Sequence, residues 1–188
     1  HGLESAIEML TILDRLNPQL LALGYPEIRV GIGINTGPMD VGDMGSSFRR
    51  AYTVLGDSVN LGSRLENLTK FYGIDILVGP ETQKQCSTWA FRFIDKIQVR
   101  GKNDSVDVYE PLAPIDQLPS HWPAELALFD RAYQAYLAQE WDRATILFTE
   151  LLFQSTQAAL YGVYLQRIES LRDQLLPPDW DGTFLHTI

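Results

Sequence analysis

The stretch from Arg50 to Glu66, which reads RAYTVLGDSVNLGSRLE, constrains the fold more than any other part of the chain. Aromatic and β-branched residues up to Leu55 are typical of a strand, and Gly56-Asp57 marks a turn. Apolar residues then recur at helical spacing as far as Tyr72, which predicts a helix over residues 57–72 with Asp57 as its N-cap. The fold must therefore contain a strand that turns directly into an amphipathic helix.

Helices and strands alternate through the first part of the chain. We expect a helix over 3–23, a strand buried on both faces over 28–35, a hairpin over 39–55, a strand over 74–78, a short helix over 80–85 and a closing hairpin over 91–109. Their spacing is not that of strict βαβ units, so we predict an α+β fold whose sheet carries helices on one face.

Gly31, Gly33 and Gly37 superficially suggest a dinucleotide-binding loop. The G-x-G-x-x-G spacing is absent, however, and Pro38 follows where a helix would have to begin. We therefore predict that these glycines allow close packing against a helix or a dimer partner.

The second part of the chain has a different composition. Four prolines fall between Pro111 and Pro123, which predicts a linker over 113–123 between a first domain, 1–112, and a helical tail, 124–188. Residues 132–152 look similar to one tetratricopeptide unit, and a further helix is expected over 158–175. Stable arrays need about three repeats, so a helical hairpin packed on the first domain is favoured.

Composition excludes several classes of function. A net charge of −9 and a pI near 4.7 argue against a nucleic-acid or anionic-membrane surface as the main partner. The three histidines are scattered, and neither a P-loop nor an apolar run of about 18 residues occurs. The single cysteine, Cys86, fits a reducing compartment, so we expect the catalytic part to be cytoplasmic. Because the chain opens with His1-Gly2, we also expect it to be a fragment of a longer protein.

Asn60 and Arg64 are the strongest candidate site residues. They lie four positions apart, so both side chains leave the same face of the predicted helix. An amide beside a guanidinium can hold a ribose oxygen and a phosphoryl group together.

The order of segments extends this observation to a family. Residues 28–66, together with ILVGPET at 76–82 and VRGKNDSVDVYE at 99–110, resemble the second half of a class III adenylate or guanylate cyclase catalytic domain. The resemblance covers roughly residues 1–112. It implies a ferredoxin-like cyclase sheet that is incomplete at its N-terminal side.

The resemblance also implies roles for single residues. Asn60 would orient the ribose or its attacking 3′-oxygen, and Arg64 would neutralise the charge that grows on the α-phosphate. Thr53 lies where the family places a base-reading residue, and a threonine there favours ATP over GTP. Arg100 lies where the family has a cation for the terminal phosphates, although a solvated hairpin charge is an equal alternative.

One part of the family pattern has no counterpart. The family binds two Mg²⁺ or Mn²⁺ ions through two aspartates, and these, with a base-reading lysine, precede the segment that matches residues 3–23. No metal ligand is therefore assigned in this chain. Because the family forms its sites between two domains in a head-to-tail dimer, this chain would supply one side of each site.

Two functions of different classes follow. The first is part of an adenylate cyclase, which converts ATP to cyclic AMP and pyrophosphate in signal transduction, with guanylate cyclase activity as a variant. The second is a non-catalytic cyclase-like module whose helical tail binds a protein partner. Two upstream aspartates and a lysine would favour the enzyme, and their absence the module.

Overall fold

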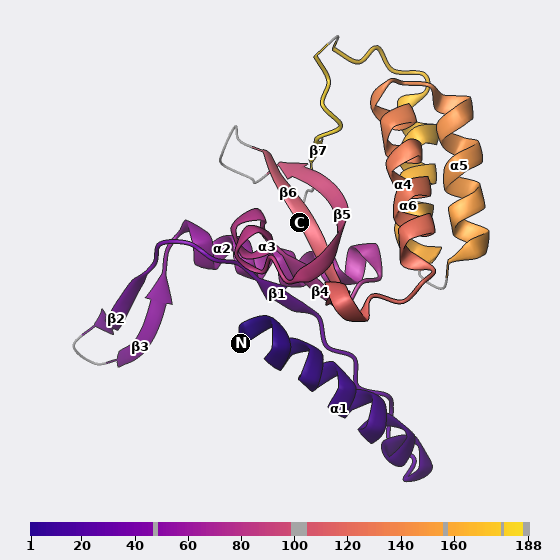
Figure 1. Ribbon diagram of the computed structural model, residues 1–188. Coiled ribbons are helices and arrows are strands. Elements are labelled where there is room, and N and C mark those ends of the chain that lie inside the picture. The colour runs from indigo at the N-terminus through magenta and orange to yellow at the C-terminus, as the bar shows by residue number, and fades with distance from the viewer. Residues whose placement is uncertain (47–48, 99–104, 156–157, 178, 186–188) are drawn as a thin grey trace.

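A mixed five-stranded sheet in the order β1-β4-β6-β5-β7 organises the molecule (Figure 1). The computed structural model describes residues 1–46, 49–98, 105–155, 158–177 and 179–185. The strands of this sheet are β1 (Ile32–Ile34), β4 (Ile76–Val78), β5 (Trp89–Gln98), β6 (Ser105–Pro114) and β7 (Phe184–Leu185). β1 pairs with β4 and β7 with β5 in parallel, whereas β6 is antiparallel to both of its neighbours.

A separate two-stranded hairpin and six α-helices complete the structure in the described part of the chain. The hairpin consists of β2 (Asp40–Ser46) and β3 (Arg49–Leu55). The helices are α1 (Gly2–Ala22), α2 (Asp57–Tyr72), α3 (Pro80–Gln85), α4 (Trp122–Leu137), α5 (Trp141–Gln154) and α6 (Ala158–Leu171), with a 3₁₀ turn at Ile115–Gln117. Among the described residues, no helix has the length and apolar character that a membrane crossing requires.

The limits of α2 follow from its flanking glycines. Gly56 is the N-cap with φ +147°, and Gly73 is a left-handed C-cap with φ +65°. Both conformations are unfavourable for residues with a Cβ. The predicted helix over 57–72 is confirmed, but Asp57 is its first helical residue and not its cap. A carboxylate in that turn still interacts favourably with the helix dipole.

Helices cover both faces of the sheet, which corrects the expectation of helices on one face. Successive residues of β4 point to opposite faces. Leu77 belongs to a core with α2 and the C-terminal helices, whereas Ile76 and Val78 belong to a second core with Leu3 and Ala6 of α1. The α+β class itself is unchanged.

The strand expected over 28–35 is shorter and less buried than its sequence suggests. Only Ile32–Ile34 pairs, and its residues are half-buried and not buried on both faces. The reason lies in Asn17 of α1, whose side-chain amide donates to the carbonyl of Ile28 and accepts from its N–H, both at 2.9 Å. These bonds tie the start of the segment to α1 and away from the sheet.

The C-terminal residues form three helices, one more than the expected hairpin. Gln139, with φ +58°, lies in the tight turn between α4 and α5. Phe148 and Tyr164 stack at the centre of the bundle with ring centroids 4.6 Å apart, and the Tyr164 hydroxyl donates to the carbonyl of Ile94 on β5 at 2.7 Å. The bundle therefore shares one apolar core with the sheet.

The connection to this bundle is ordered. The boundary expected at 112/113 falls within β6, which continues to Pro114 and leads through the 3₁₀ turn to α4. The division into 1–112, 113–123 and 124–188 stays a prediction.

Candidate active site

The N-terminal half of α2 is held against β1 by contacts between backbones. A Cβ on Gly33 would lie 2.2 Å from the carbonyl oxygen of Gly62 and 2.4 Å from the nitrogen of Glu66. At the end of β1, the side-chain amide of Asn35 donates to the carbonyl of Ser58 at 3.0 Å. The predicted close packing of these glycines against a helix is confirmed. It fixes the first two turns of α2 relative to the sheet.

Asn60 and Arg64 leave α2 within this fixed part. Asn60 lies in the first turn and is exposed, and Arg64 lies one turn later and is half-buried. Their spacing of four residues places both on one helix face. An exposed amide next to a partly withdrawn guanidinium offers hydrogen-bond donors and one positive charge to an anionic ligand. The structure therefore brings the two predicted residues together as a pair.

Thr53 lies on the strand that leads into α2. It pairs with Gly42 across the β2–β3 hairpin and is half-buried. β3 contacts α2, so Thr53 and the Asn60–Arg64 pair belong to neighbouring elements. Arg100, the fourth predicted site residue, lies outside the described residues.

The aspartates of β2 do not fit a two-metal site. Asp40 and Asp43 are exposed and three residues apart, so they point to opposite faces of the strand. Among the residues that the structure describes, no group of three or more potential metal ligands comes together. The described side chains therefore do not form a site for the family's two metal ions.

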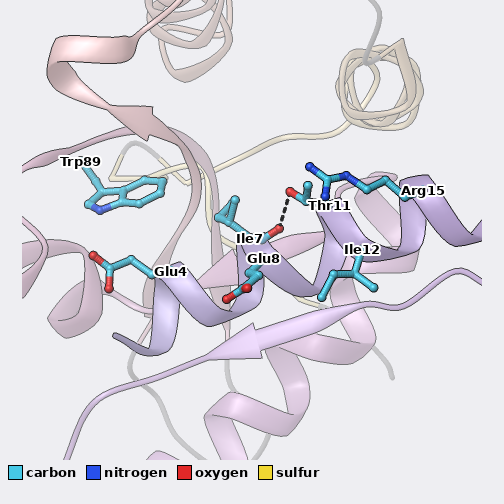
Figure 2. Close-up of a pocket in the computed structure, with 7 residues that line it drawn as sticks. All are labelled: Glu4, Ile7, Glu8, Thr11, Ile12, Arg15 and Trp89. Atoms are coloured by element: carbon cyan, nitrogen blue, oxygen red, sulfur yellow. Dashed lines mark hydrogen bonds between the residues drawn. The ribbon is translucent and has the colours of Figure 1, made fainter.

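A groove of about 370 Å³ lies elsewhere, between α1 and β5 (Figure 2). Its lining residues are Glu4, Ile7, Glu8, Thr11, Ile12, Arg15 and Trp89. The carboxylates of Glu4 and Glu8 outnumber the one guanidinium of Arg15, so the lining is net negative and disfavours a polyphosphate. The groove is therefore a poor match for a nucleotide, and neither Asn60 nor Arg64 lines it.

Comparison with known proteins agrees with this arrangement of elements. Residues 3–110 match the family model described as the adenylate and guanylate cyclase catalytic domain. The chain belongs to this family. The helical segment after residue 110 lies outside the match, so the family model does not test its likeness to tetratricopeptide repeats.

The cyclase relatives are much longer than this chain. An adenylate cyclase from Anabaena cylindrica is 40% identical over 117 residues, which cover 58% of this chain and 23% of the relative. Adenylate cyclase 1 of Rhizobium meliloti is 35% identical over 111 residues, which cover 58% of this chain and 17% of the relative. The chain thus spans about a fifth of these relatives.

A solved structure supports the fold of the matched part. The adenylyl cyclase CyaB from P. aeruginosa is 30% identical, with a TM-score of 0.51 over 60% of this chain and 58% of that one. The predicted α+β cyclase fold is thereby confirmed.

Sequence reasoning missed a group of buried charges behind the site. Tyr72 ends α2, Asp95 lies on β5 and Arg167 on α6, and all three are buried together. These residues are far apart in the sequence, so no local motif announces them. The one available signal is Arg167 itself, which continues the apolar stripe of Leu160, Tyr161 and Tyr164.

Proposed function

We propose that this chain is part of an adenylate cyclase, which forms cyclic AMP and pyrophosphate from ATP. The observation that carries the proposal is the Asn60–Arg64 pair on one face of α2, fixed by backbone contacts within a domain that matches the cyclase family. Relatives at 40% and 35% identity are named adenylate cyclases.

The two side chains suit the charge changes of this reaction. As the ribose 3′-oxygen attacks the α-phosphorus, negative charge grows on the phosphoryl oxygens and on the departing pyrophosphate. Arg64, held half-buried on a fixed helix, can neutralise that charge without reorganising. Asn60, one turn earlier and exposed, can hold the ribose oxygen in line. Both effects act on the transition state more than on bound ATP.

The β2–β3 hairpin supports a head-to-tail dimer in the complete enzyme. Tyr52 is 76% exposed on β3, and Val41 and Leu55 are more than half exposed on the same hairpin. An isolated two-stranded hairpin is only marginally stable in water. A second cyclase domain would cover these apolar side chains and face the Asn60–Arg64 pair. We assign the two Mg²⁺ or Mn²⁺ ions, the aspartates that hold them and the base-reading lysine to parts of the parent protein outside these residues.

The first experiment measures cyclic AMP formation by the complete protein. We expect Asn60→Ala and Arg64→Ala each to lower kcat by about 10²–10³-fold, the range for losing one transition-state donor. Glu66→Ala is the matched control, because Glu66 is exposed on α2 but leaves another face. Full activity in both variants would refute the proposal. The 188-residue chain alone is expected to be inactive with MgATP or MnATP, and robust turnover would contradict that expectation.

Thr53 is the proposed residue for nucleotide choice. Its hydroxyl can accept a hydrogen bond from the adenine amino group or donate one to a guanine carbonyl, so its chemistry permits both bases. The family pattern favours ATP. Competition between ATP and GTP in the complete protein tests this, and preferential cyclisation of GTP would establish a guanylate cyclase instead.

A second candidate is a non-catalytic cyclase-like module with a tetratricopeptide-like tail that binds protein. Ile146 is 67% and Phe153 is 83% exposed, seven residues apart on one face of α5. Contiguous apolar patches on a surface mark interaction sites, and these two side chains would form part of such a patch. Absence of turnover with either nucleotide in the folded complete protein would favour this module. For the enzyme, we propose a cytoplasmic location of the catalytic part, where ATP is available.

A further inference from the structure

Arg167 of α6 is buried against the sheet. The residue is 3% exposed, and its Nη2 donates to the carboxylate of Asp95 on β5 at 2.6 Å. Asp95 is fully buried. Burial lowers the pKa of Arg167, but the neighbouring Asp95 raises that pKa by more than burial lowers it. The guanidinium therefore stays charged. Two opposite charges withdrawn from water in this way depend on each other, because removing one leaves the other uncompensated.

The same carboxylate holds the end of α2. The hydroxyl of Tyr72, the last residue of the helix, donates to Asp95, and Arg167 Nη2 lies 3.3 Å from that hydroxyl. Burial and then the neighbouring Asp95 raise the pKa of Tyr72, which keeps the phenol protonated as a donor. We call Tyr72, Asp95 and Arg167 the buried anchor. It joins α2, β5 and α6 through one carboxylate.

α2 is well suited to carry an effect from this anchor to the site. Tyr72 lies twelve residues after Asn60, or about 18 Å along a continuous helix. Between the two, Gly33 and Gly62 bring the backbones of β1 and α2 into direct contact. No flexible side chain lies at that contact to absorb a tilt of the helix at Tyr72. Such a tilt therefore strains the same contact that fixes Asn60 and Arg64 against the sheet.

The C-terminal strand also contacts the anchor. The guanidinium of Arg167 lies 3.9 Å from the ring centroid of Phe184 on β7, and β7 pairs with the end of β5. Lys96, next to Asp95, forms a salt bridge of 2.5 Å with Asp181. The segment that follows α6 thus closes over the buried charges.

We propose that Arg167 and Asp95 are positioning residues for Asn60 and Arg64, so that the C-terminal helices set the geometry of the active site through Tyr72. The part about catalysis rests on the proposed cyclase function. The part about α2 does not, because it concerns the rigidity of one helix in this chain.

A second buried ion cluster at the same interface provides a matched control. Arg92 of β5 is fully buried and donates to Glu110 of β6 at 2.5 Å and to Glu125 of α4 at 3.2 Å. It also donates to the hydroxyl of Tyr161 on α6 at 2.7 Å. This cluster joins the helical bundle to the sheet just as the anchor does, but its partners lie on β6, α4 and α6.

Amide hydrogen exchange on the 188-residue chain tests whether the buried anchor holds α2 in place. Because Arg167→Met alone leaves a buried carboxylate, the paired variant D95N/R167M removes both charges, and R92M/E110Q removes a pair from the control cluster. We expect D95N/R167M to accelerate exchange over residues 65–72 by about tenfold or more, and R92M/E110Q to leave those amides unchanged. If residues 65–72 of folded D95N/R167M exchange as slowly as in the unaltered chain, or if both variants accelerate this exchange equally, the proposal is overturned.

Activity of the complete protein tests the catalytic part. We expect D95N/R167M to lower kcat about tenfold or more with little change in KM, because misplacement affects the transition state most. Arg167→Lys, which keeps one charge near Asp95, should recover part of kcat. If the unaltered protein has no activity but α2 loosens specifically, the cyclase function fails and the positioning stands. If the protein is active and D95N/R167M keeps full kcat, the positioning role fails and the cyclase function stands.

Discussion

Gly33 gives the sharpest prediction for stability. In Gly33→Ala, the new methyl group would lie 2.2 Å and 2.4 Å from backbone atoms of α2, which cannot rotate away as a side chain does. Overpacking of this kind costs up to about 3 kcal/mol. Replacing glycine also restricts the unfolded chain, which returns up to about 1 kcal/mol. The net loss is therefore about 2 kcal/mol, or a fall in Tm of about 4–8 °C for a chain of this size.

Thermal unfolding followed by circular dichroism measures this loss directly. Gly162→Ala is the control, since Gly162 lies within α6 and a Cβ there meets nothing within 4 Å. That variant should gain about 0.5–1 kcal/mol from helix propensity. If Gly33→Ala unfolds at or above the native temperature, the contact between β1 and α2 is not as close as described, and the transmission along α2 loses its basis.

Two further predictions concern the helical bundle. Phe148→Ala should lose about 3–5 kcal/mol in urea denaturation, because the buried ring stacks on Tyr164; a loss below about 1 kcal/mol would contradict this packing. At high pH, burial raises the pKa of Tyr136 from 10.0 to about 12. Between these two pKa values the folded state binds more protons than the unfolded state. The stability that Tyr136 contributes should therefore be fully present below pH 10 and be lost as the pH rises through 12. Tyrosinate absorbance measures the titration and circular dichroism measures unfolding. Titration of Tyr136 near pH 10 in a protein that stays folded would disprove this prediction.

Local patterns in the sequence were sufficient to predict α2 and the helix face shared by Asn60 and Arg64. Gly56 and Gly73 mark both ends of the helix, and the spacing of Asn60 and Arg64 places them on one face whatever surrounds it. These features depend on residues close in sequence. The prediction of α2 and of the paired side chains was therefore correct before any tertiary contact was known.

Features that depend on distant residues were not predicted. The strand expected from Ile28 is shortened by hydrogen bonds from Asn17, and neither residue has a pattern that reveals the other. The two-sided cover of the sheet places α1 and α2, which are separated in the sequence by three strands, on opposite faces of β4. The sequence places Arg167 in an apolar stripe and gives no sign of its partner, because Asp95 lies 72 residues away. Periodicity identifies which residues are buried but not which buried charges meet.

The pairing of β7 with β5 has a consequence for the order of folding. Phe184 closes an edge of the sheet whose partner, Ile97, is made about ninety residues earlier in synthesis. Until residues 184–185 have been made, that edge of β5 has open hydrogen-bonding groups and is a template for intermolecular pairing. Completion of the sheet is thus a late, non-local event, and a chain interrupted after α6 would present an aggregation-prone edge at the moment of its release.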